Sequence, residues 1–344
     1  MMTNKTKILL IYTGGTIGMV KDYETGVLRP FHFEKIKERL PELFQLDSDI
    51  EHVSFDPPID SSDMNIAHWK RIAQSIEENY NKFDGFVVLH GSDTMGYSAS
   101  ALSFMLENLD KPVIFTGSQL PIGDLRTDAR ENLITSIRLA SLKENNQSVI
   151  QEVCLYFEYK LYRGNRTTKI DAENFQAFDS PNYHILAESG VHLKVYNEYL
   201  KHKENKSTKL NLFTDFNPNV TFLKIFPNIT EPILEGILNI PSLKGVVMET
   251  FGSGNAPTSE WFLKTIEKAI KRGVAVVNIT QCIRGFVLPN TYEAGSHFEN
   301  IGVINGKDLT SEAAITKLMY LLGKEIRHKE LKIKYEKEIQ GEIS

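Results

Sequence analysis

The chain has only two cysteines, Cys154 and Cys282, which stand far apart in the sequence and form no CxxC motif. That spacing gives no support to a disulfide framework or to a thiolate metal site. The low cysteine content suits a reducing compartment, and we predict a cytoplasmic location.

Long apolar runs are also lacking. The longest early run, residues 8–12, is too short for a signal peptide and is followed directly by Gly14 and Gly15. No stretch approaches the roughly 18 apolar residues that span a bilayer, so we expect no membrane partner. The net charge is -5 and basic residues are interleaved with acidic ones, which argues against a nucleic-acid partner. The nine histidines show no HExxH or similar spacing, so we expect no metal.

The chain does have length: 344 residues, 41% of them hydrophobic, are enough for two cores. Short β-rich runs alternate with helical periodicity, which predicts an α/β fold. The predicted strands are 7–13, 86–90, 112–116, 153–157, 220–226, 245–248 and 274–278, and the predicted helices are 65–80, 94–109, 128–142, 230–238 and 258–272. Asp63 and Asp93 stand where N-caps of the first two helices would be.

A polar, lysine-rich stretch without apolar periodicity divides the chain. We predict an N-terminal domain over 1–196, a linker over 197–212 and a second α/β domain over 213–330. Residues 331–344 are predicted to be a charged tail that serves as a surface or packing element rather than a functional one.

Two motifs follow predicted strands. Tyr12-Thr-Gly-Gly-Thr-Ile-Gly18 places the Thr16 hydroxyl at the carboxyl end of the first strand, where open α/β sheets form their ligand crevice. Leu89-His-Gly-Ser-Asp-Thr-Met95 places Ser92 and Asp93 at a helix start, whose N–H groups suit a substrate carboxylate or an oxyanion. The alternatives are a purely structural turn for the first motif and helix capping for the second. His90 is predicted to be a strand-end core or hydrogen-bonding histidine.

Two further polar segments complete the candidates. Asp60, Ser61 and Ser62 lie in a loop before a helix, where they would either bind an ammonium group or act as caps. Lys169 ends the segment Leu161-Tyr-Arg-Gly-Asn-Arg-Thr-Thr-Lys169. It would activate a hydroxyl if Asp93 oriented it, as in a Ser–Lys arrangement, and is otherwise a solvated loop lysine.

Taken together, these four motifs strongly resemble the bacterial-type L-asparaginase family, and most of all its cytoplasmic, or type I, branch. Three further segments strengthen the resemblance: 101–109, Gly252-Ser-Gly-Asn-Ala-Pro257 and Thr280-Gln-Cys-Ile-Arg-Gly285. The resemblance implies a larger N-terminal α/β domain and a smaller C-terminal flavodoxin-like α/β domain. It also implies a homodimer or homotetramer that hydrolyses L-asparagine without a cofactor.

The resemblance also implies roles for particular residues. Thr16 matches the acylated threonine, and Ser92, Asp93 and Lys169 match a second catalytic centre. Asp60, Ser61 and Ser62 align with residues that hold the substrate's α-ammonium and α-carboxylate groups, with Asp93 helping at the ammonium. The chemistry agrees, because carboxylates attract a cation while hydroxyls and helix-start N–H groups suit an anion.

The chain departs from the family pattern at three places. Ser92 stands where most relatives have threonine, a change that keeps the hydroxyl. Val27 stands where many relatives carry a tyrosine that activates the nucleophile, and Val27 cannot take that role. Tyr292 matches a later tyrosine used by some cytoplasmic relatives, and Tyr23 is the second choice; a packing role is the alternative for either.

The third departure concerns regulation. Thr168 and Cys282 match residues of an allosteric asparagine site, but Glu249 stands where that site has arginine. A carboxylate in place of a cation should disfavour the effector's carboxylate, which argues against allosteric activation but leaves both alternatives open.

Two other functions fit the same pocket. One is the asparaginase-like subunit of a tRNA-dependent amidotransferase; such subunits usually carry an extra N-terminal domain, for which the start of the first strand near Lys7 leaves no room. The other is a non-catalytic amino-acid-binding regulator, against which the retention of Thr16, Asp93 and Lys169 argues.

Overall fold

The computed structural model describes residues 5–21, 28–30, 40–201, 209–288 and 293–344. They form two compact units, Met1–Ser180 with His184–Phe213, and Pro181–Tyr183 with Thr214–Ser344. Residues 202–208 of the predicted linker, and also Tyr23, Val27 and Tyr292, lie outside the described residues.

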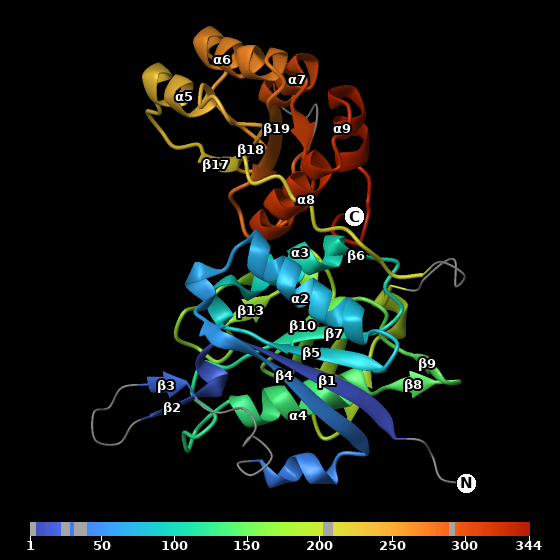
Figure 1. Ribbon diagram of the computed structural model, residues 1–344. Helices are drawn as coiled ribbons and strands as arrows, with labels where there is room; N and C mark the ends of the chain where they lie inside the picture. The colour runs from blue at the N-terminus through green and yellow to red at the C-terminus, as the bar shows by residue number, and fades with distance from the viewer. Residues whose placement is uncertain (1–4, 22–27, 31–39, 202–208, 289–292) are drawn as a thin grey trace. The chain divides into compact units, whose positions relative to one another are not determined.

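The first unit is built on one mixed sheet of eight strands (Figure 1). Its order is β15-β14-β11-β10-β7-β5-β1-β4; the strands from β10 to β4 are parallel and the remaining pairs are antiparallel. In chain order the strands are β1 (Thr6–Gly14), β4 (Ser48–Ile59), β5 (Gly85–Leu89), β7 (Val113–Thr116), β10 (Val153–Phe157), β11 (Lys160–Arg163), β14 (Ala187–Ser189) and β15 (Leu193–Val195). Because β5, β7 and β10 are buried along their whole length, they read as continuous apolar runs.

Helices cover both faces of this sheet. Helices α2 (Ile66–Asn79) and α3 (Met95–Met105) pack against each other over one face, and α4 (Ala129–Ala140) covers the other (Figure 1). The unit also contains two-stranded sheets outside the main sheet: β2 (Met19–Lys21) with β3 (Leu28–Pro30), β6 (Leu106–Glu107) with β16 (Asn211–Leu212), β8 (Lys143–Glu144) with β9 (Gln147–Ser148), and β12 (Thr168–Lys169) with β13 (Phe178–Asp179).

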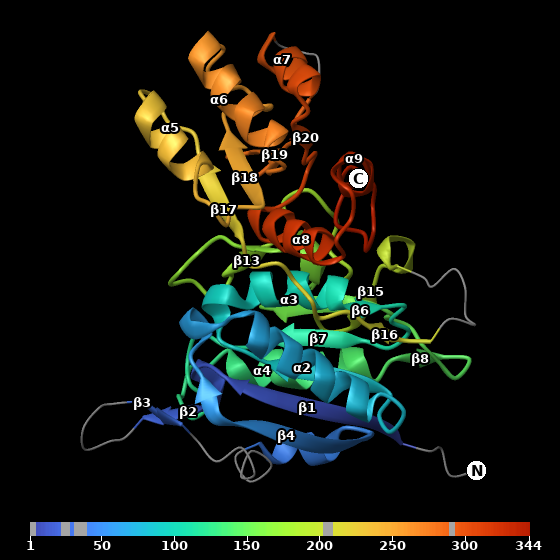
Figure 2. The same ribbon diagram turned by 45° about the horizontal axis from the view of Figure 1, so that its top comes forward.

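The second unit has four parallel strands in sequence order. They are β17 (Val220–Lys224), β18 (Gly245–Thr250), β19 (Ala275–Thr280) and β20 (Ile304–Asn305). Helices α5 (Glu231–Leu238), α6 (Glu260–Lys271) and α7 (Glu293–Ile301) lie over one face, while α8 (Ser311–Gly323) covers the other and packs on α9 (His328–Tyr335) (Figure 2). The predicted fold, a larger α/β unit followed by a smaller one, is confirmed.

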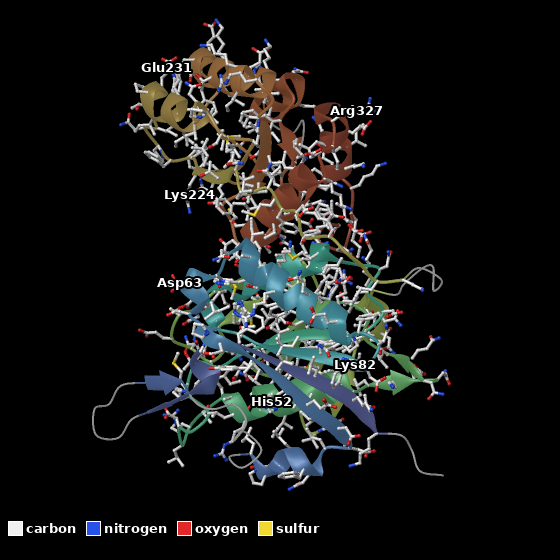
Figure 3. The ribbon with its side chains drawn as sticks, in the orientation of Figure 1. His52, Asp63, Lys82, Lys224, Glu231 and Arg327 are labelled. Carbon is white, nitrogen blue, oxygen red and sulfur yellow. The ribbon has the colours of Figure 1, made fainter. Side chains whose placement is uncertain are left out.

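The predicted helix caps are wrong. The N-cap of α2 is Asn65, whose Oδ1 accepts the N–H groups of Ala67 and His68 at 3.0 and 3.2 Å. Asp63, labelled in Figure 3, lies instead in the 3-10 turn η4 (Ser61–Asp63) that separates β4 from α2. Asp93 does not cap α3 either: the N-cap is Thr94, which makes no side-chain cap hydrogen bond.

Strand β4 was not predicted, although it is twelve residues long. It is the edge strand of the sheet and pairs only with β1, so most of its side chains are exposed and show no apolar alternation. It also contains Pro57 and Pro58, which an edge strand tolerates but a central strand does not.

The predicted charged tail contributes Glu342 to a buried ion pair of the second unit. Lys317 Nζ on α8 lies 2.5 Å from Glu342 Oε1, and both side chains are fully buried. The ammonium also donates to the Lys337 carbonyl at 2.7 Å, and the Glu342 carboxylate accepts the N–H groups of Ile339 and Gln340. Residues 337–342 therefore pack into the unit through charge-assisted hydrogen bonds.

We predict that Lys317→Met lowers the free energy of unfolding by about 3 to 5 kcal/mol, because it leaves the Glu342 carboxylate buried without its cation. The double variant Lys317→Met with Glu342→Gln should recover much of that loss, since no uncompensated charge then remains. Urea unfolding of both proteins measures the difference. A double variant as unstable as the single one would show that the loss comes from packing rather than charge.

Candidate active site

Three turns meet where parallel strands of the first unit end. Residue Tyr12 of β1 pairs with Leu89 of β5, and Gly14 pairs with Ile59 of β4, so the three strands finish at one edge of the sheet. Each strand leads into a 3-10 turn: η1 (Thr16–Gly18), η4 and η5 (Ser92–Thr94). The candidate residues of three motifs are thereby gathered at this edge, where α/β sheets bind ligands.

Glycines let these turns approach each other. Gly15 has a φ of 88°, and a Cβ atom there would lie 2.5 Å from the backbone nitrogen of Gly91. A Cβ atom on Gly91 would in turn lie 2.5 Å from Ser61 Oγ. Any larger residue at either glycine would push the turns apart. The Thr94 hydroxyl adds a further tie by donating to the Ser61 carbonyl at 2.7 Å.

Lys169 joins this group from a distant part of the chain. Its Nζ donates to Ser92 Oγ at 2.9 Å and to Asp93 Oδ1 at 2.7 Å. The lysine side chain is 19% exposed, whereas that of Asp93 is 69% exposed and faces solvent. The contact considered for a Ser–Lys arrangement is present, and neither Ser92 nor Asp93 caps a helix with its side chain.

Gln119 is a residue that the sequence reasoning missed. Ser92 Oγ accepts the hydrogen bond of Lys169 and donates its own proton to Gln119 Oε1 at 3.3 Å. The Gln119 amide group donates to the Asn174 carbonyl at 3.0 Å, and its backbone N–H donates to the Asp128 carboxylate. Gln119 follows β7 in the segment Thr116-Gly-Ser-Gln119, so its position just after a parallel strand was the available signal.

The Asp60 loop presents an anion to solvent. Asp60 Oδ1 accepts the Ser62 N–H at 2.9 Å and the Ser62 hydroxyl at 2.7 Å. These hydrogen bonds, the backbone one first, hold the pKa of Asp60 below its ordinary value. The carboxylate therefore stays charged at neutral pH and can attract a cation. Asp60 is also the N-cap of η4. It therefore combines the two predicted alternatives, a capping residue and an exposed anion.

The other predicted site residues that the structure describes make none of the contacts described above. Thr16, half-buried, begins η1, and Thr168 lies in β12 of the first unit. Glu249 and Cys282 belong to the second unit, where Glu249 accepts a hydrogen bond from Ser311 Oγ at 2.6 Å and lies 3.9 Å from Lys224 Nζ. Cys282 is an exposed free thiol, and Cys154 is buried in β10.

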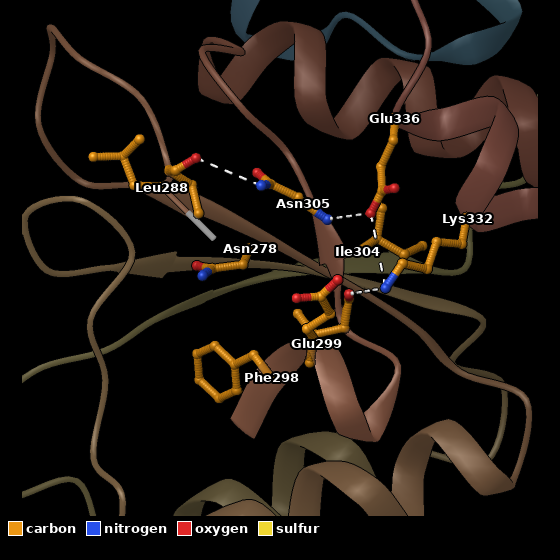
Figure 4. A pocket seen from close by; sticks show the side chains of 10 residues that line it. Asn278, Leu288, Phe298, Glu299, Ile304, Asn305, Lys332 and Glu336 are labelled. Atoms are coloured by element: carbon orange, nitrogen blue, oxygen red, sulfur yellow. Dashed lines mark hydrogen bonds and ion pairs between the residues drawn. The ribbon is translucent and has the colours of Figure 1, made fainter. Parts of the chain in front are cut away.

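A pocket of the second unit contains none of the predicted residues (Figure 4). It lies between α7, α9 and the edge strand β20. Its polar groups bind one another: Glu336 accepts the Asn305 N–H at 2.9 Å, and Lys332 donates to the Val303 carbonyl at 3.0 Å.

Within the described ranges, no group of three or more His, Cys, Asp or Glu side chains is arranged to hold a metal ion. No helix in that part of the chain is long and apolar enough to cross a membrane.

An α/β unit that gathers hydroxyl, lysine and carboxylate groups at the carboxyl edge of its sheet has the features of a hydrolase with a hydroxyl nucleophile. The chain belongs to the asparaginase family: residues 7–201 match the model of the asparaginase N-terminal domain, and residues 219–333 match the glutaminase/asparaginase C-terminal domain.

Individual relatives agree with this assignment. The chain is 39% identical over 343 residues to L-asparaginase 1 of Escherichia coli K12, covering 99% of this chain and 98% of that protein. The crystal structure of L-asparaginase I from Vibrio cholerae matches with a TM-score of 0.89 at 39% identity and covers 99% of both chains. The chain is also 43% identical over 345 residues to the 60 kDa lysophospholipase of Mus musculus, covering 94% of this chain but 59% of that protein.

We predict that Lys169→Met lowers turnover by a factor of about a thousand while leaving the thermal midpoint nearly unchanged, because the lysine contacts polar groups rather than the core. The matched control is Lys143→Met. It removes an ion pair in which Lys143 Nζ lies 2.8 Å from Asp84 Oδ1, and this pair is not part of the three turns of the candidate site. It should keep near-native turnover. If Lys169→Met mainly unfolded the protein, the contact with Asp93 would be a structural ion pair.

Proposed function

We propose that the chain is an L-asparaginase that hydrolyses free L-asparagine to L-aspartate and ammonia through Thr16. The observation that carries the proposal is the contact of Lys169 Nζ with both Ser92 Oγ and Asp93 Oδ1, beside the turn that Thr16 begins. A lysine held between a hydroxyl and a carboxylate is suited to moving protons at a reacting centre.

In the first half of the reaction, Thr16 Oγ attacks the side-chain amide carbon of asparagine. A C–O bond forms, the carbonyl oxygen becomes an oxyanion, and backbone N–H groups of the turns stabilise it. The C–N bond then breaks, and ammonia leaves with the proton that the hydroxyl gave up. The product of this half is a β-aspartyl ester on Thr16.

In the second half, water attacks the ester carbon and restores the hydroxyl. The Ser92, Lys169 and Asp93 group assists proton transfer, and Asp93 keeps the ammonium of Lys169 in place. Water is the only co-substrate, and no cofactor takes part.

The substrate is a zwitterion and needs two anchors. The charged Asp60 carboxylate and exposed Asp93 suit the α-ammonium group, and the Ser61 hydroxyl suits the α-carboxylate. The Ser62 hydroxyl, which donates to Asp60, holds that carboxylate in place. Fixed anchors set how far the amide carbon reaches toward Thr16. The extra methylene of glutamine would misplace that carbon by about 1 Å, which can cost roughly a hundredfold in rate.

The purified protein tests the proposal: ammonia release is measured with asparagine, glutamine and D-asparagine as separate substrates, and fatty-acid release is measured with a lysophospholipid. We expect asparagine to have by far the largest kcat/KM. Comparable constants for asparagine and glutamine would refute the anchoring geometry. Hydrolysis of the lysophospholipid alone would instead favour the activity named for the mouse relative.

The nucleophile has its own prediction. Thr16→Ala should leave a folded protein whose turnover falls by at least about a thousandfold, the scale seen when a nucleophile is deleted. The control is Ser92→Thr, which keeps the hydroxyl and should stay within about tenfold of wild type. Near-native turnover of Thr16→Ala would end the assignment.

We infer that Tyr292, rather than Tyr23, activates Thr16, since Val27 has no proton to move. Tyr292→Phe should lower turnover by about a hundredfold or more, as expected for loss of a general acid–base group, and Tyr23→Phe should have little effect. Steady-state kinetics of the two variants decides between them. Unchanged turnover of Tyr292→Phe together with a large loss in Tyr23→Phe would assign the role to Tyr23.

The same proposal includes a cytoplasmic homodimer or homotetramer in which asparagine is substrate but not activator. Glu249, already hydrogen-bonded by Ser311, supports the last point, because an effector carboxylate would meet an anion. An amidotransferase subunit is less well supported, since the match to L-asparaginase 1 extends over 98% of that protein. Size-exclusion chromatography with light scattering measures the assembly.

A further inference from the structure

His90 lies two residues before Ser92, the first residue of η5, and is completely buried. Both ring nitrogens have partners: Nδ1 is 2.7 Å from the Gly91 carbonyl oxygen, and Nε2 is 2.8 Å from Ser98 Oγ. Ser98 Oγ also accepts the indole N–H of Trp69 at 2.9 Å. The ring thus connects the buried side chains of Trp69 on α2 and Ser98 on α3 to the Gly91 backbone of the candidate site.

The chemistry of the partners determines where the proton lies in each of these hydrogen bonds. A carbonyl oxygen can only accept, so the proton of the His90 ring sits on Nδ1 and is donated to Gly91. Nε2 is then an acceptor and takes the Ser98 hydroxyl proton, while the Ser98 lone pair takes the Trp69 N–H. Burial lowers the pKa of His90 to about 4, which keeps the ring neutral, as this arrangement requires.

The direction of the Gly91 carbonyl determines the direction of the next N–H. In a trans peptide the C=O and N–H bonds point opposite ways, and the Gly91–Ser92 bond is trans. Because the carbonyl is turned toward the buried His90 ring, the Ser92 N–H points away from it. Ser92 is the first residue of η5, so this N–H is one that the helix itself cannot use.

We propose that His90 is a positioning residue for asparagine hydrolysis, which holds the Gly91–Ser92 peptide so that the Ser92 N–H is aimed at the oxyanion of the reacting amide. The inference rests on the proposed function. His90 itself touches no substrate and transfers no proton. Its effect reaches the reaction through the peptide that also carries Ser92 Oγ to Lys169.

The size of the effect follows from this indirect role. Deleting an oxyanion donor costs about a hundredfold or more in kcat, and a donor that remains but loses its fixed direction should cost less, about tenfold. The donor acts on charge that develops only in the transition state. The loss should therefore appear in kcat, with KM changed by less than about twofold.

Four single variants of the full chain test the proposal. His90→Leu removes the donor to Gly91, and His90→Asn restores it, because the asparagine amide nitrogen can occupy the place of Nδ1. Ser98→Ala is the matched control: it disrupts the opposite side of the same buried ring but leaves the Nδ1 donor. His90→Gln, whose amide lies nearer the position of Nε2, replaces His90→Leu if that variant does not fold.

We expect His90→Leu to lose about tenfold in kcat, with His90→Asn and Ser98→Ala each within about threefold of wild type, although Ser98→Ala should melt earlier. A folded His90→Leu or His90→Gln with wild-type kcat overturns the proposal. So does equal impairment of His90→Asn and His90→Leu, or a Ser98→Ala variant as slow as His90→Leu, since each would indicate general disturbance of packing.

The ring state can be tested without any turnover. Nitrogen-15 NMR of histidine-labelled wild-type protein at pH 7 should show His90 protonated on Nδ1 and unprotonated on Nε2. Protonation on Nε2 overturns the proposal. If the ring state is as expected but asparagine is not hydrolysed, the proposed function fails instead, so the two failures are distinguishable.

Discussion

The close approach of Gly15 to Gly91 is the constraint on which the candidate site depends. Parallel pairing of β1 with β5 brings the two strand ends to one edge, but only residues without a Cβ atom let the following turns touch. That contact sets where Thr16 begins its turn and where Ser92 begins the next. Lys169 then needs only to reach Ser92 and Asp93, which it does at hydrogen-bond distance.

Below this edge, the site is supported by buried groups whose protons have fixed places. The Thr13 hydroxyl donates to the Leu89 carbonyl at 2.9 Å, which ties the ends of β1 and β5 together. His90, Ser98 and Trp69 continue the support into the helices. A rigid base of this kind is what a preorganised site requires, because donors aimed in advance need no rearrangement during the reaction.

Much of the fold could be predicted from the sequence, and the limits have physical causes. Strands β5, β7 and β10 are fully buried, and α2 has a clear apolar stripe, so their patterns are strong. The edge strand β4 has no such pattern because most of its side chains are exposed to solvent. The caps were misassigned because aspartate is a residue type that often caps helices. In the structure Asn65 caps α2 in place of Asp63, and the Asp93 side chain binds Lys169 instead of a helix N–H group.

The candidate site was less accessible to sequence reasoning. Lys169 and Ser92 are 77 residues apart, and nothing in their spacing shows that they touch. The hypothesis of their contact came from chemical type and family resemblance. Gln119 was missed because a single amide after a strand forms no motif, and its role depends on partners in three other segments. The burial of Glu342 against Lys317 was likewise not apparent, because residues 331–344 read as a charged tail.

The most direct test of the central claim is to find the acylated residue. The wild-type protein is quenched in acid while it turns over asparagine, digested, and mapped by mass spectrometry. The account predicts a β-aspartyl ester on the peptide that contains Thr16, with the peptide that contains Ser92 unmodified. An ester on Ser92 and an unmodified Thr16 would contradict it.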